Sequence, residues 1–278
     1  MSKISFQGVE GAYSNLAVQE FFPNAEPMPC KTFEIAIQEA ESGNADYAMI
    51  PIENSAAGRV ADIHRLLPKS QLHINYEHFQ KVDHKLLIHP NAQLDNVKKV
   101  ISHEQALAQC SEKIQKLDLD ILIGADTAGS AKMISENNIL DTAAIASSLA
   151  ANIYGLKTVD ESFANSKNNI TRFYVMSKNE NQKYNPQKQY ISSFLFAVNN
   201  TPGSLFKVMG GFATNNVNMI KLESYNYGAD FVITEFYCEI EGHPDQDNTK
   251  FALDDMYHYC SKVKKLGVFE KSIYRSRQ

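Results

Sequence analysis

The sequence predicts an α/β protein in two parts: strands alternate with helices in the first, and the second has the order β-α-β-β-α-β. In the first part, short apolar segments alternate with segments of helical character up to about residue 177, as in mostly parallel sheets covered by helices. A polar segment over residues 179–189 contains a proline and has no apolar period, which indicates a domain boundary. The pattern after it is that of the ferredoxin-like split βαβ unit.

The alternating part begins with a strand over residues 3–7 and a helix over residues 14–22. Thr32 is placed to cap a second helix, which Gly43 ends. The elements expected after it are a strand 45–50, a helix 59–67, strands 72–79, 85–89 and 97–101, a helix 104–117, a strand 120–123, helices 127–137 and 143–154, and a strand 172–177.

The second part is expected to form an antiparallel sheet with two helices on one face. Its expected elements are a strand 190–198, a helix 203–215, strands 217–225 and 231–241, a helix 248–263 and a strand 268–274. We therefore expect a first domain over residues 1–178, a linker over 179–189 and a second domain over 190–278.

The composition excludes several classes of protein. Hydrophobic residues make up 44% of the chain and charged residues 21%, which are ordinary globular values rather than those of a disordered or collagen-like chain. The net charge of −5 argues against a nucleic-acid binder, because such proteins usually carry a basic excess. The charge-free, apolar run over residues 142–156 is shorter than the roughly 20 residues of a membrane span.

The N-terminus and the cysteines favour a reducing compartment. The chain runs directly into a strand-like segment with no apolar signal region, so we expect a cytoplasmic protein with free thiols. The four cysteines show no C-x-x-C spacing, and the eight histidines show no H-x-x-x-H spacing. We therefore expect no metal site.

The segment GVEGAYS, residues 8–14, joins the first strand to the first helix. Its two glycines allow the backbone to approach a ligand closely, and the N-terminus of the helix that Ser14 caps favours an anion. The alternative is an ordinary tight turn with a routine cap. The spacing is not the G-x-G-x-x-G of a dinucleotide site.

The segment PIENSAAG, residues 51–58, follows a strand and precedes a helix. It places Glu53, Asn54 and Ser55 at the carboxyl end of a strand, where open α/β sheets bind ligands. Asn54 and Ser55 are suited to donate hydrogen bonds to a carboxylate, with Glu53 as an acid or as an organiser of the site. The alternative is a polar loop without function.

The segment NNITRF, residues 168–173, enters the last strand of the first part. Arg172 is suited to forked carboxylate recognition, and the hydroxyl of Thr171 beside it to donating a hydrogen bond to a leaving oxygen. The alternative is a strand start with an ion-pairing arginine.

Two further segments, residues 101–107 and 126–131, open helices and place hydroxyl groups at their N-termini. Thr127 lies in the second of them. His103, in the first, is a candidate catalytic group, although a histidine at this position is more often a capping residue.

In the second part, residues 200–206, NTPGSLF, form a sharp turn that exposes backbone amides before a helix. Glu223 and Ser224 lie on the strand that follows. Units of this kind bind small effectors when two copies pair. The alternative is a packing or dimerisation module without a ligand.

Together these segments resemble the prephenate dehydratase family over nearly the whole chain. Five motifs in family order, followed by a βαββαβ unit, make the resemblance specific. The five motifs are G-x-x-G-A-Y-S at residues 8–14, P-I-E-N-S at 51–55, I-S-H-x-Q-A-L at 101–107, D-T-A at 126–128 and N-x-T-R-F at 169–173.

The resemblance implies a catalytic domain of two α/β lobes of the periplasmic-binding-protein type, roughly residues 1–78 with 165–178, and 79–164. The substrate, prephenate, would bind in the cleft between them. The C-terminal unit would be a regulatory ACT domain with L-phenylalanine as effector. Thr171 is the residue that the family treats as essential.

The reaction that the resemblance implies converts prephenate to phenylpyruvate, carbon dioxide and water, and aromatisation of the ring drives it. It requires no cofactor or metal; the protein must hold the anionic groups and offer a hydrogen bond to the departing oxygen. We assign catalysis to Thr171, Arg172 and Glu53. Substrate binding is assigned to Ser14, Asn54, Ser55, Thr127, Asn169 and Phe173.

The resemblance also implies an effector site between paired ACT units. It is assigned to Asn200, Gly203, Leu205, Glu223 and Ser224. The family's E-S-R-P reads Glu223-Ser224-Tyr225-Asn226 here, so we expect phenylalanine to bind less tightly. We also expect a homo-oligomer, a dimer or tetramer, because the apolar strands 190–198 and 231–237 require further burial.

Three alternatives remain. An arogenate dehydratase shares the fold and the motifs, so the chain does not separate the two substrates. A two-lobed solute-binding protein would need an export signal. A non-catalytic amino-acid sensor is disfavoured by the intact Thr171-Arg172-Phe173.

Overall fold

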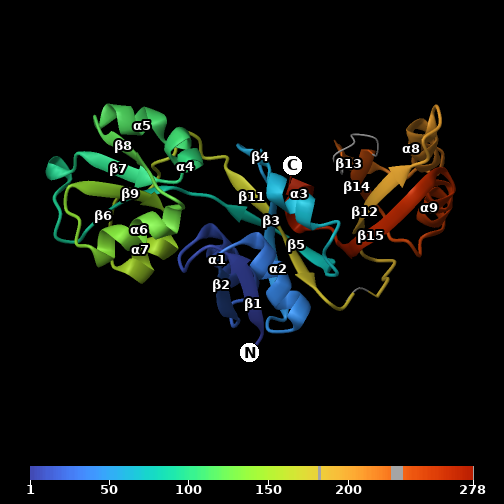
Figure 1. The fold of residues 1–278 in the computed structure, drawn as a ribbon, viewed down its shortest axis with the longest axis horizontal. Helices are drawn as coiled ribbons and strands as arrows, with labels where there is room; N and C mark the ends of the chain where they lie inside the picture. The colour runs from blue at the N-terminus through green and yellow to red at the C-terminus, as the bar shows by residue number, and fades with distance from the viewer. Residues whose placement is uncertain (181–182, 227–233, 278) are drawn as a thin grey trace. The chain divides into compact units, whose positions relative to one another are not determined.

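The computed structural model describes residues 1–180, 183–226 and 234–277 and divides the chain into two compact units (Figure 1). The first unit contains residues 1–64 and 78–174, and the second contains residues 65–77 and 175–278. Strands β5 (His73–Lys81) and β11 (Ile170–Ser177) each have residues in both units.

The first lobe of the first unit is built on strands in the order β2-β1-β3-β11-β5. Strand β1 (Lys3–Gln7) pairs in parallel with both β2 (Glu26–Cys30) and β3 (Tyr47–Asn54). The apolar residues of β1 and β3 are fully buried, as expected for strands covered on both faces. The other elements of the lobe are α1 (Tyr13–Phe21), α2 (Phe33–Ser42), β4 (Gly58–Arg59) and α3 (Ala61–Leu66).

The second lobe contains a five-stranded sheet in the order β10-β6-β9-β7-β8. Strand β7 pairs in parallel with β8 and β9, whereas β6 is antiparallel to β9 and β10. Helices cover the sheet and enclose two clusters of buried apolar side chains. The strands are β6 (Lys85–Ile88), β7 (Lys99–Ser102), β8 (Asp120–Ile123), β9 (Thr142–Ala146) and β10 (Lys157–Asp160). The helices are η1 (Leu94–Asn96), α4 (Glu104–Gln109), α5 (Ser111–Lys116), α6 (Thr127–Glu136) and α7 (Ser148–Tyr154).

The helix predicted over residues 143–154 is wrong at its start, because the segment forms strand β9 as far as Ala146 and helix α7 only from Ser148. The single helix predicted over residues 104–117 is also wrong, because that segment forms two helices, α4 and α5. Cys110 separates them with a backbone outside the helical region, φ −116° and ψ 9°. Its amide donates to the carbonyl of Leu107, three residues back, rather than four. The break lets the thiol of Cys110 stay fully buried in the core of the lobe.

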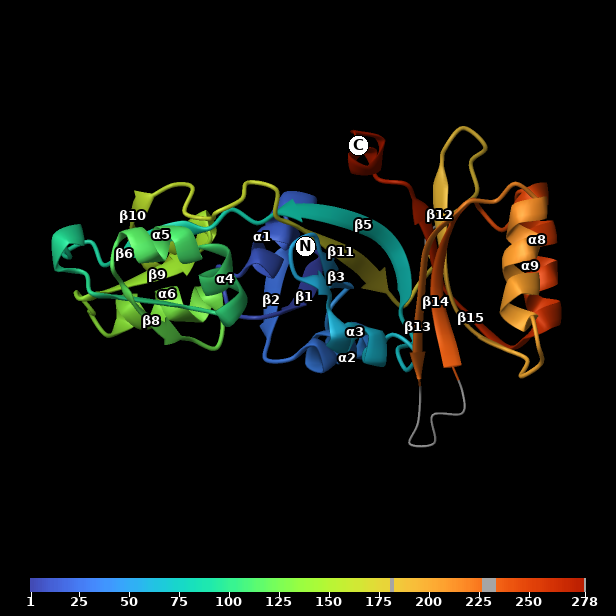
Figure 2. The same ribbon diagram turned by 90° about the horizontal axis from the view of Figure 1, so that it is seen from above.

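The βαββαβ order predicted for the second unit is confirmed. Its sheet has the order β13-β14-β12-β15 with every pair antiparallel. Helices α8 (Ser204–Thr214) and α9 (Asp247–Tyr259) lie side by side on one face of this sheet (Figure 2). The strands are β12 (Tyr190–Val198), β13 (Met219–Asn226), β14 (Thr234–Glu241) and β15 (Cys260–Glu270), and η2 (Ile273–Arg277) follows.

The predicted end of this unit, a helix to residue 263 and a strand over 268–274, is wrong. Helix α9 ends at Tyr259 and β15 begins at Cys260, because residues 260–265 pair along β12. Further along β15, Gly267 pairs with Ile74 of β5. Its close approach to the backbone of Ile74 leaves no room for a side chain. The start of the predicted strand 231–241 lies outside the described residues.

Within the described ranges, none of the helices combines the length and the apolar character that crossing a membrane requires. In the same part of the chain, no three histidine, cysteine, aspartate or glutamate residues gather as a metal site would need.

Candidate active site

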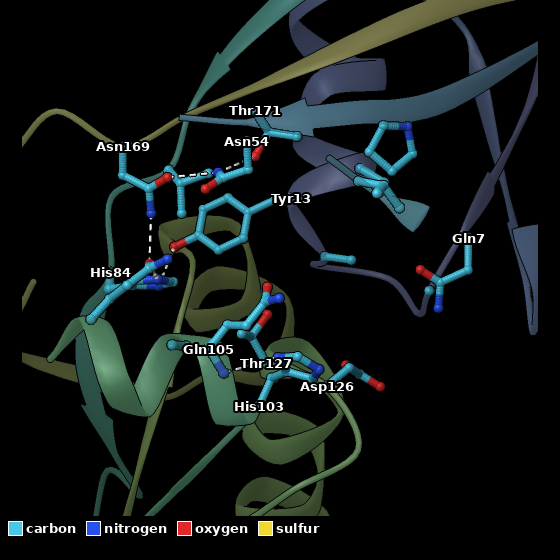
Figure 3. Close-up of a pocket in the computed structure, with 18 of the residues that line it drawn as sticks. Gln7, Tyr13, Asn54, His84, His103, Gln105, Asp126, Thr127, Asn169 and Thr171 are labelled. Carbon is cyan, nitrogen blue, oxygen red and sulfur yellow. Dashed lines mark hydrogen bonds between the residues drawn. The ribbon is translucent and has the colours of Figure 1, made fainter. Parts of the chain in front are cut away.

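A cavity of about 240 Å³ in the first unit is lined by residues from both lobes (Figure 3). From the first lobe come the turn before α1, the carboxyl end of β3 and the start of β11. From the second lobe come the starts of α4 and α6 and the segment before β6. The lining residues are Gln7, Gly8, Ala12, Tyr13, Ser14, Pro51, Asn54, Val60, Val82, His84, His103, Gln105, Ala106, Gln109, Asp126, Thr127, Asn169, Thr171 and Phe173.

The turn between β1 and α1 has a shape that requires glycine. Gly8 and Gly11 adopt positive φ angles of 123° and 85°, which side-chain-bearing residues rarely adopt. A Cβ at Gly11 would lie 2.8 Å from the Cα of Ala150 in the second lobe. The turn therefore brings the N-terminus of α1 to the cavity in close contact with α7.

Three helix N-termini border the cavity. At α1 the N-cap residue is Ala12, not the predicted Ser14, which lies inside the helix. Ala12 makes no side-chain capping hydrogen bond, so the first amides of this helix are not satisfied by a cap. At α6 the Asp126 carboxylate accepts from the amide of Gly129 over 2.6 Å, and at α4 the ring of His103 accepts from the amide of Gln105. The amides and dipole of an uncapped helix start favour an anion.

Asn54 holds Thr171 in the cavity wall. Its Oδ1 accepts hydrogen bonds from the amides of Ala56 and Ala57, both at 2.9 Å. Its Nδ2 donates to Thr171 Oγ1 over 2.9 Å and to Asn169 Oδ1 over 2.7 Å. Because the Thr171 oxygen accepts from Asn54, the hydroxyl proton of Thr171 is left to be donated elsewhere.

The hydrogen bonds continue from Asn169 across the cavity to the opposite wall (Figure 3). Asn169 Nδ2 donates to Gln109 Oε1 over 2.7 Å, and His84 Nε2 lies 2.9 Å from the same oxygen. His84 Nδ1 lies 3.0 Å from the Tyr13 hydroxyl. Burial raises the pKa of Tyr13 well above its usual value and lowers the pKa of His84. Both groups are therefore uncharged at neutral pH.

Arg172 follows Thr171 on β11 but does not line the cavity. Successive side chains of a strand point to opposite faces of the sheet, so Arg172 points away from the side on which Thr171 lies. Its side chain is only 3% exposed, and Nη1 lies 2.9 Å from Glu53 Oε1. The guanidinium also lies 4.9 Å from the centre of the Tyr174 ring.

The comparisons with known proteins agree with this architecture. A family model described as prephenate dehydratase matches residues 4–181, well over half of the chain. This chain belongs to the prephenate dehydratase family. It is an enzyme of that family, a hydro-lyase, and the resemblance read from its motifs is confirmed.

Relatives match this family member over almost its full length. A bifunctional N-acyl-homoserine lactone acylase/prephenate dehydratase of Komagataeibacter europaeus is 40% identical over 99% of this chain and 98% of its own. An arogenate dehydratase/prephenate dehydratase of Arabidopsis thaliana, named as chloroplastic, is 34% identical over 98% of this chain and 73% of its own.

A solved structure gives the fold of this family member independently. The prephenate dehydratase of Arthrobacter aurescens in complex with L-Phe superposes with a TM-score of 0.88 at 25% identity, over 97% of this chain and 90% of its own. The predicted fold class, two lobes of the periplasmic-binding-protein type followed by a βαββαβ unit, is confirmed.

The structure brings together only some of the predicted site residues. Those that line the cavity are Ser14, Asn54, Thr127, Asn169, Thr171 and Phe173. Ser55 is exposed and holds two chain segments together: its hydroxyl donates to the carbonyl of Asn168 and accepts from the amide of Ile170. Arg172 and Glu53 bind each other away from the cavity, so the expectation that they would face the substrate beside Thr171 is not met.

Sequence patterns did not indicate three cavity residues that are linked by hydrogen bonds: Tyr13, His84 and Gln109. Tyr13 lies inside the GVEGAYS segment, in which only the glycines and the helix cap indicate a ligand site from sequence alone. Gln109 follows the helix start at residues 101–107, at the far end of α4. His84 belongs to no motif, and only the fold shows that it lies beside Tyr13, 71 positions away in sequence.

The predicted effector residues lie on two elements of the second unit. Asn200, Gly203 and Leu205 surround the start of α8, where Gly203 is the exposed N-cap residue with a φ of 79°. Glu223 and Ser224 lie on β13, and Glu223 forms an ion pair with Lys221 over 3.2 Å. The side chain of Tyr225 lies outside the described residues.

Proposed function

We propose that this chain converts prephenate to phenylpyruvate, carbon dioxide and water. The observation that carries the proposal is the hydrogen bond from Asn54 to the oxygen of Thr171, which leaves the threonine proton for a group inside the cavity. The departing hydroxyl of prephenate is a group of that kind.

In this reaction the bond from the ring carbon to the carboxylate carbon breaks and releases carbon dioxide. Its electron pair shifts through the ring, which becomes aromatic as the bond to the ring hydroxyl breaks. The departing hydroxide takes up a proton and leaves as water. A threonine hydroxyl is a weak acid, so we assign Thr171 the stabilisation of the departing oxygen by a hydrogen bond rather than complete proton transfer.

The substrate carboxylates are proposed to bind at helix N-termini. Among the described residues, neither lysine nor arginine lines the cavity. The uncapped start of α1 provides backbone amides and the positive end of a helix dipole. At α6 the Asp126 carboxylate already accepts from the amide of Gly129 and opposes a second anion. Ser14 and Thr127, in the first turns of these helices, add hydroxyl donors. In this proposal they replace Arg172 as the anion-binding groups.

Arogenate, in which an ammonium group replaces the keto group, remains the second candidate substrate. The observation in its favour is Asp126, whose carboxylate lines the cavity. This carboxylate already caps α6 through Gly129, so we favour prephenate, whose keto group needs no counter-charge.

The test is a spectrophotometric assay of the purified chain with each substrate. We expect phenylpyruvate to form from prephenate with a kcat/KM higher than that for phenylalanine formation from arogenate. A higher kcat/KM with arogenate would make arogenate the favoured substrate. If the chain turned over neither substrate, the proposed function would be refuted.

We further propose that L-phenylalanine binds at the start of α8 and inhibits the enzyme. Gly203, with its positive φ, has no side chain to block its backbone amides, and the Arthrobacter relative was solved with L-Phe. Because Tyr225 stands where the family has arginine, we expect weaker binding or a weaker response, within the roughly 5- to 150-fold range typical of allosteric coupling. Calorimetry with phenylalanine, followed by inhibition assays, measures both. No heat and no inhibition at millimolar phenylalanine would make the unit an assembly module, and sub-micromolar inhibition would show that Tyr225 is no handicap.

The homo-oligomer and the cytoplasmic location remain proposals. The oligomer prediction rested on the need of the apolar strands 190–198 and 231–237 for further burial, but residues 190–197 of β12 and 235–240 of β14 are buried within the single chain. Residues 231–233 lie outside the described ranges. The surface of these strands therefore gives a dimer or tetramer no support, and light scattering of the purified chain decides it.

A further inference from the structure

The orientation of one side chain, Asn54, determines which groups donate and which accept in the hydrogen bonds across the cavity. Asn54 Oδ1 faces two backbone amides, those of Ala56 and Ala57. Backbone amides only donate, so the amide group of Asn54 can take only one of its two orientations. Its Nδ2 must therefore be the donor to Asn169 Oδ1 and to Thr171 Oγ1.

The orientation of Asn169 in turn determines the donor and acceptor roles of the residues on the opposite wall. With its oxygen facing Asn54, Asn169 presents Nδ2 to Gln109 and donates to Oε1. That oxygen can only accept, so His84 must carry its proton on Nε2, the nitrogen 2.9 Å away. In a neutral imidazole the other nitrogen, Nδ1, is then an acceptor. The Tyr13 hydroxyl, 3.0 Å from Nδ1, must therefore donate its proton to His84.

We propose that His84 is a positioning residue that makes the Tyr13 oxygen a hydrogen-bond acceptor toward the cavity and turns the Nε2 amide of Gln109 toward the substrate. The inference rests on the proposed function and adds to it a pattern of donors and acceptors. Thr171 and Gln109 offer protons, whereas Tyr13 offers lone pairs.

This pattern suits a hydroxyl group and disfavours a carboxylate at the hydroxyl end of the Tyr13 side chain, away from the backbone amides at the start of α1. A hydroxyl both accepts and donates, so the ring hydroxyl of the substrate accepts from Thr171 while donating to the Tyr13 oxygen. A carboxylate has no proton to donate and would be repelled by the lone pairs of Tyr13. These donor and acceptor roles therefore favour binding of a dicarboxylate hydroxy acid with its hydroxyl group, rather than a carboxylate, toward β11.

The surroundings of His84 keep it neutral. The groups that face it are the Tyr13 phenol, the Gln109 amide and the neighbouring Asp83 carboxylate, and the nearby Cys110 is a neutral thiol whose pKa burial raises to about 12. Burial lowers the pKa of His84, while Asp83 and the hydrogen bond to Gln109 raise it by less. The neutral form is therefore present above a pKa that lies below the ordinary histidine value, and it is lost as the pH falls through that pKa.

Protonation of His84 would reverse the role of Tyr13. Nδ1 would then carry a proton and donate to the Tyr13 oxygen, and the phenol proton would turn toward the cavity. The site would present donors where the neutral form presents an acceptor. We therefore expect kcat/KM to fall on the acid side, with His84 as the group that titrates.

The first test needs no substrate, so its failure is distinguishable from failure of the proposed function. Nitrogen-15 NMR of the ring nitrogens at pH 7.5 reports which nitrogen of each histidine carries the proton. The His84 signal is identified by its absence in His84→Asn. We expect neutral His84 with the proton on Nε2. A proton on Nδ1, or a doubly protonated ring, overturns the proposal.

The second test compares His84→Asn with His84→Phe. The amide oxygen of Asn lies near the position of Nδ1 and can accept from Tyr13, whereas Phe accepts nothing and leaves Tyr13 without its partner. We expect kcat/KM to fall about tenfold to a hundredfold in His84→Phe, as for loss of a buried hydrogen-bond partner. His84→Asn should recover most of this loss and lack the acid limb of the pH profile.

Two results overturn the positioning role: equal losses in both variants, and an acid limb that persists in His84→Asn. Unfolding midpoints of both variants show whether a loss reflects folding instead. If His84→Phe does not fold, the pH profile of His84→Asn and the NMR measurement still decide.

Discussion

Replacing Thr171 by alanine is expected to lower kcat by about a hundredfold to a thousandfold, the loss typical of removing one donor that stabilises a developing oxyanion. Thr171 is half-buried at the cavity wall, and its oxygen accepts a hydrogen bond from Asn54. Its proton is thereby left for the departing oxygen. Since the interaction grows as charge develops on that oxygen, we expect the loss in kcat and not mainly in KM.

Matched variants at the same position separate the hydroxyl from the shape of the side chain. Thr171→Val keeps the volume and the branch at Cβ but lacks the hydroxyl, and should lose as much activity as Thr171→Ala. Thr171→Ser keeps the hydroxyl and should retain much more. Single-substrate kinetics with prephenate give kcat and KM for each variant. A Thr171→Val enzyme within tenfold of wild type would remove Thr171 from the chemistry.

The sequence predicts the place of Thr171 in the site correctly, but not that of its neighbour Arg172. The order of the motifs placed Thr171 and Asn54 at strand ends, and both line one cavity. Arg172 was expected to share that cavity because its guanidinium suits forked carboxylate recognition. Adjacency in a strand means opposite faces, so once both residues are placed in β11 the alternation alone excludes a shared direction.

The opposite wall was beyond the reach of sequence patterns. His84 contacts Gln109 and Tyr13, which are 25 and 71 positions away. No local period or spacing records such contacts, because they arise only when the two lobes are folded. A short buried segment before a strand carries no signal that separates a site histidine from a core histidine.

The fold itself was predictable where local pattern and tertiary pairing agree. The βαββαβ order was visible because each strand and helix of that unit has its own apolar pattern. The border between α9 and β15 was not, because residues 260–265 carry three lysines and have no clear alternation of apolar residues. Pairing with β12 makes them a strand, which is a case of tertiary contacts overriding local preference.

Replacing Arg172 by methionine is expected to destabilise the fold by about 3 kcal/mol, near the lower end of the cost of breaking a buried ion pair. Arg172 is only 3% exposed, but its partner Glu53 is 33% exposed. Water can therefore reach the carboxylate left behind, which reduces the cost. The variant also loses the contact of the guanidinium with the Tyr174 ring. Urea unfolding with a fitted slope measures the change.

The experiment has two controls. Glu53→Gln combined with Arg172→Met should recover part of the lost stability, because both members of the ion pair are then neutralised together. Lys99→Ala breaks the exposed ion pair of Lys99 and Asp141, whose side chains are 42% and 54% exposed, and should cost no more than about 1 kcal/mol.

In Arg172→Lys the folded enzyme should keep its KM for prephenate within about threefold, because the side chain lies outside the cavity. If Arg172→Lys instead raised KM tenfold or more at unchanged stability, Arg172 would be a substrate-binding residue after all, and the anion site at the helix N-termini would lose its support.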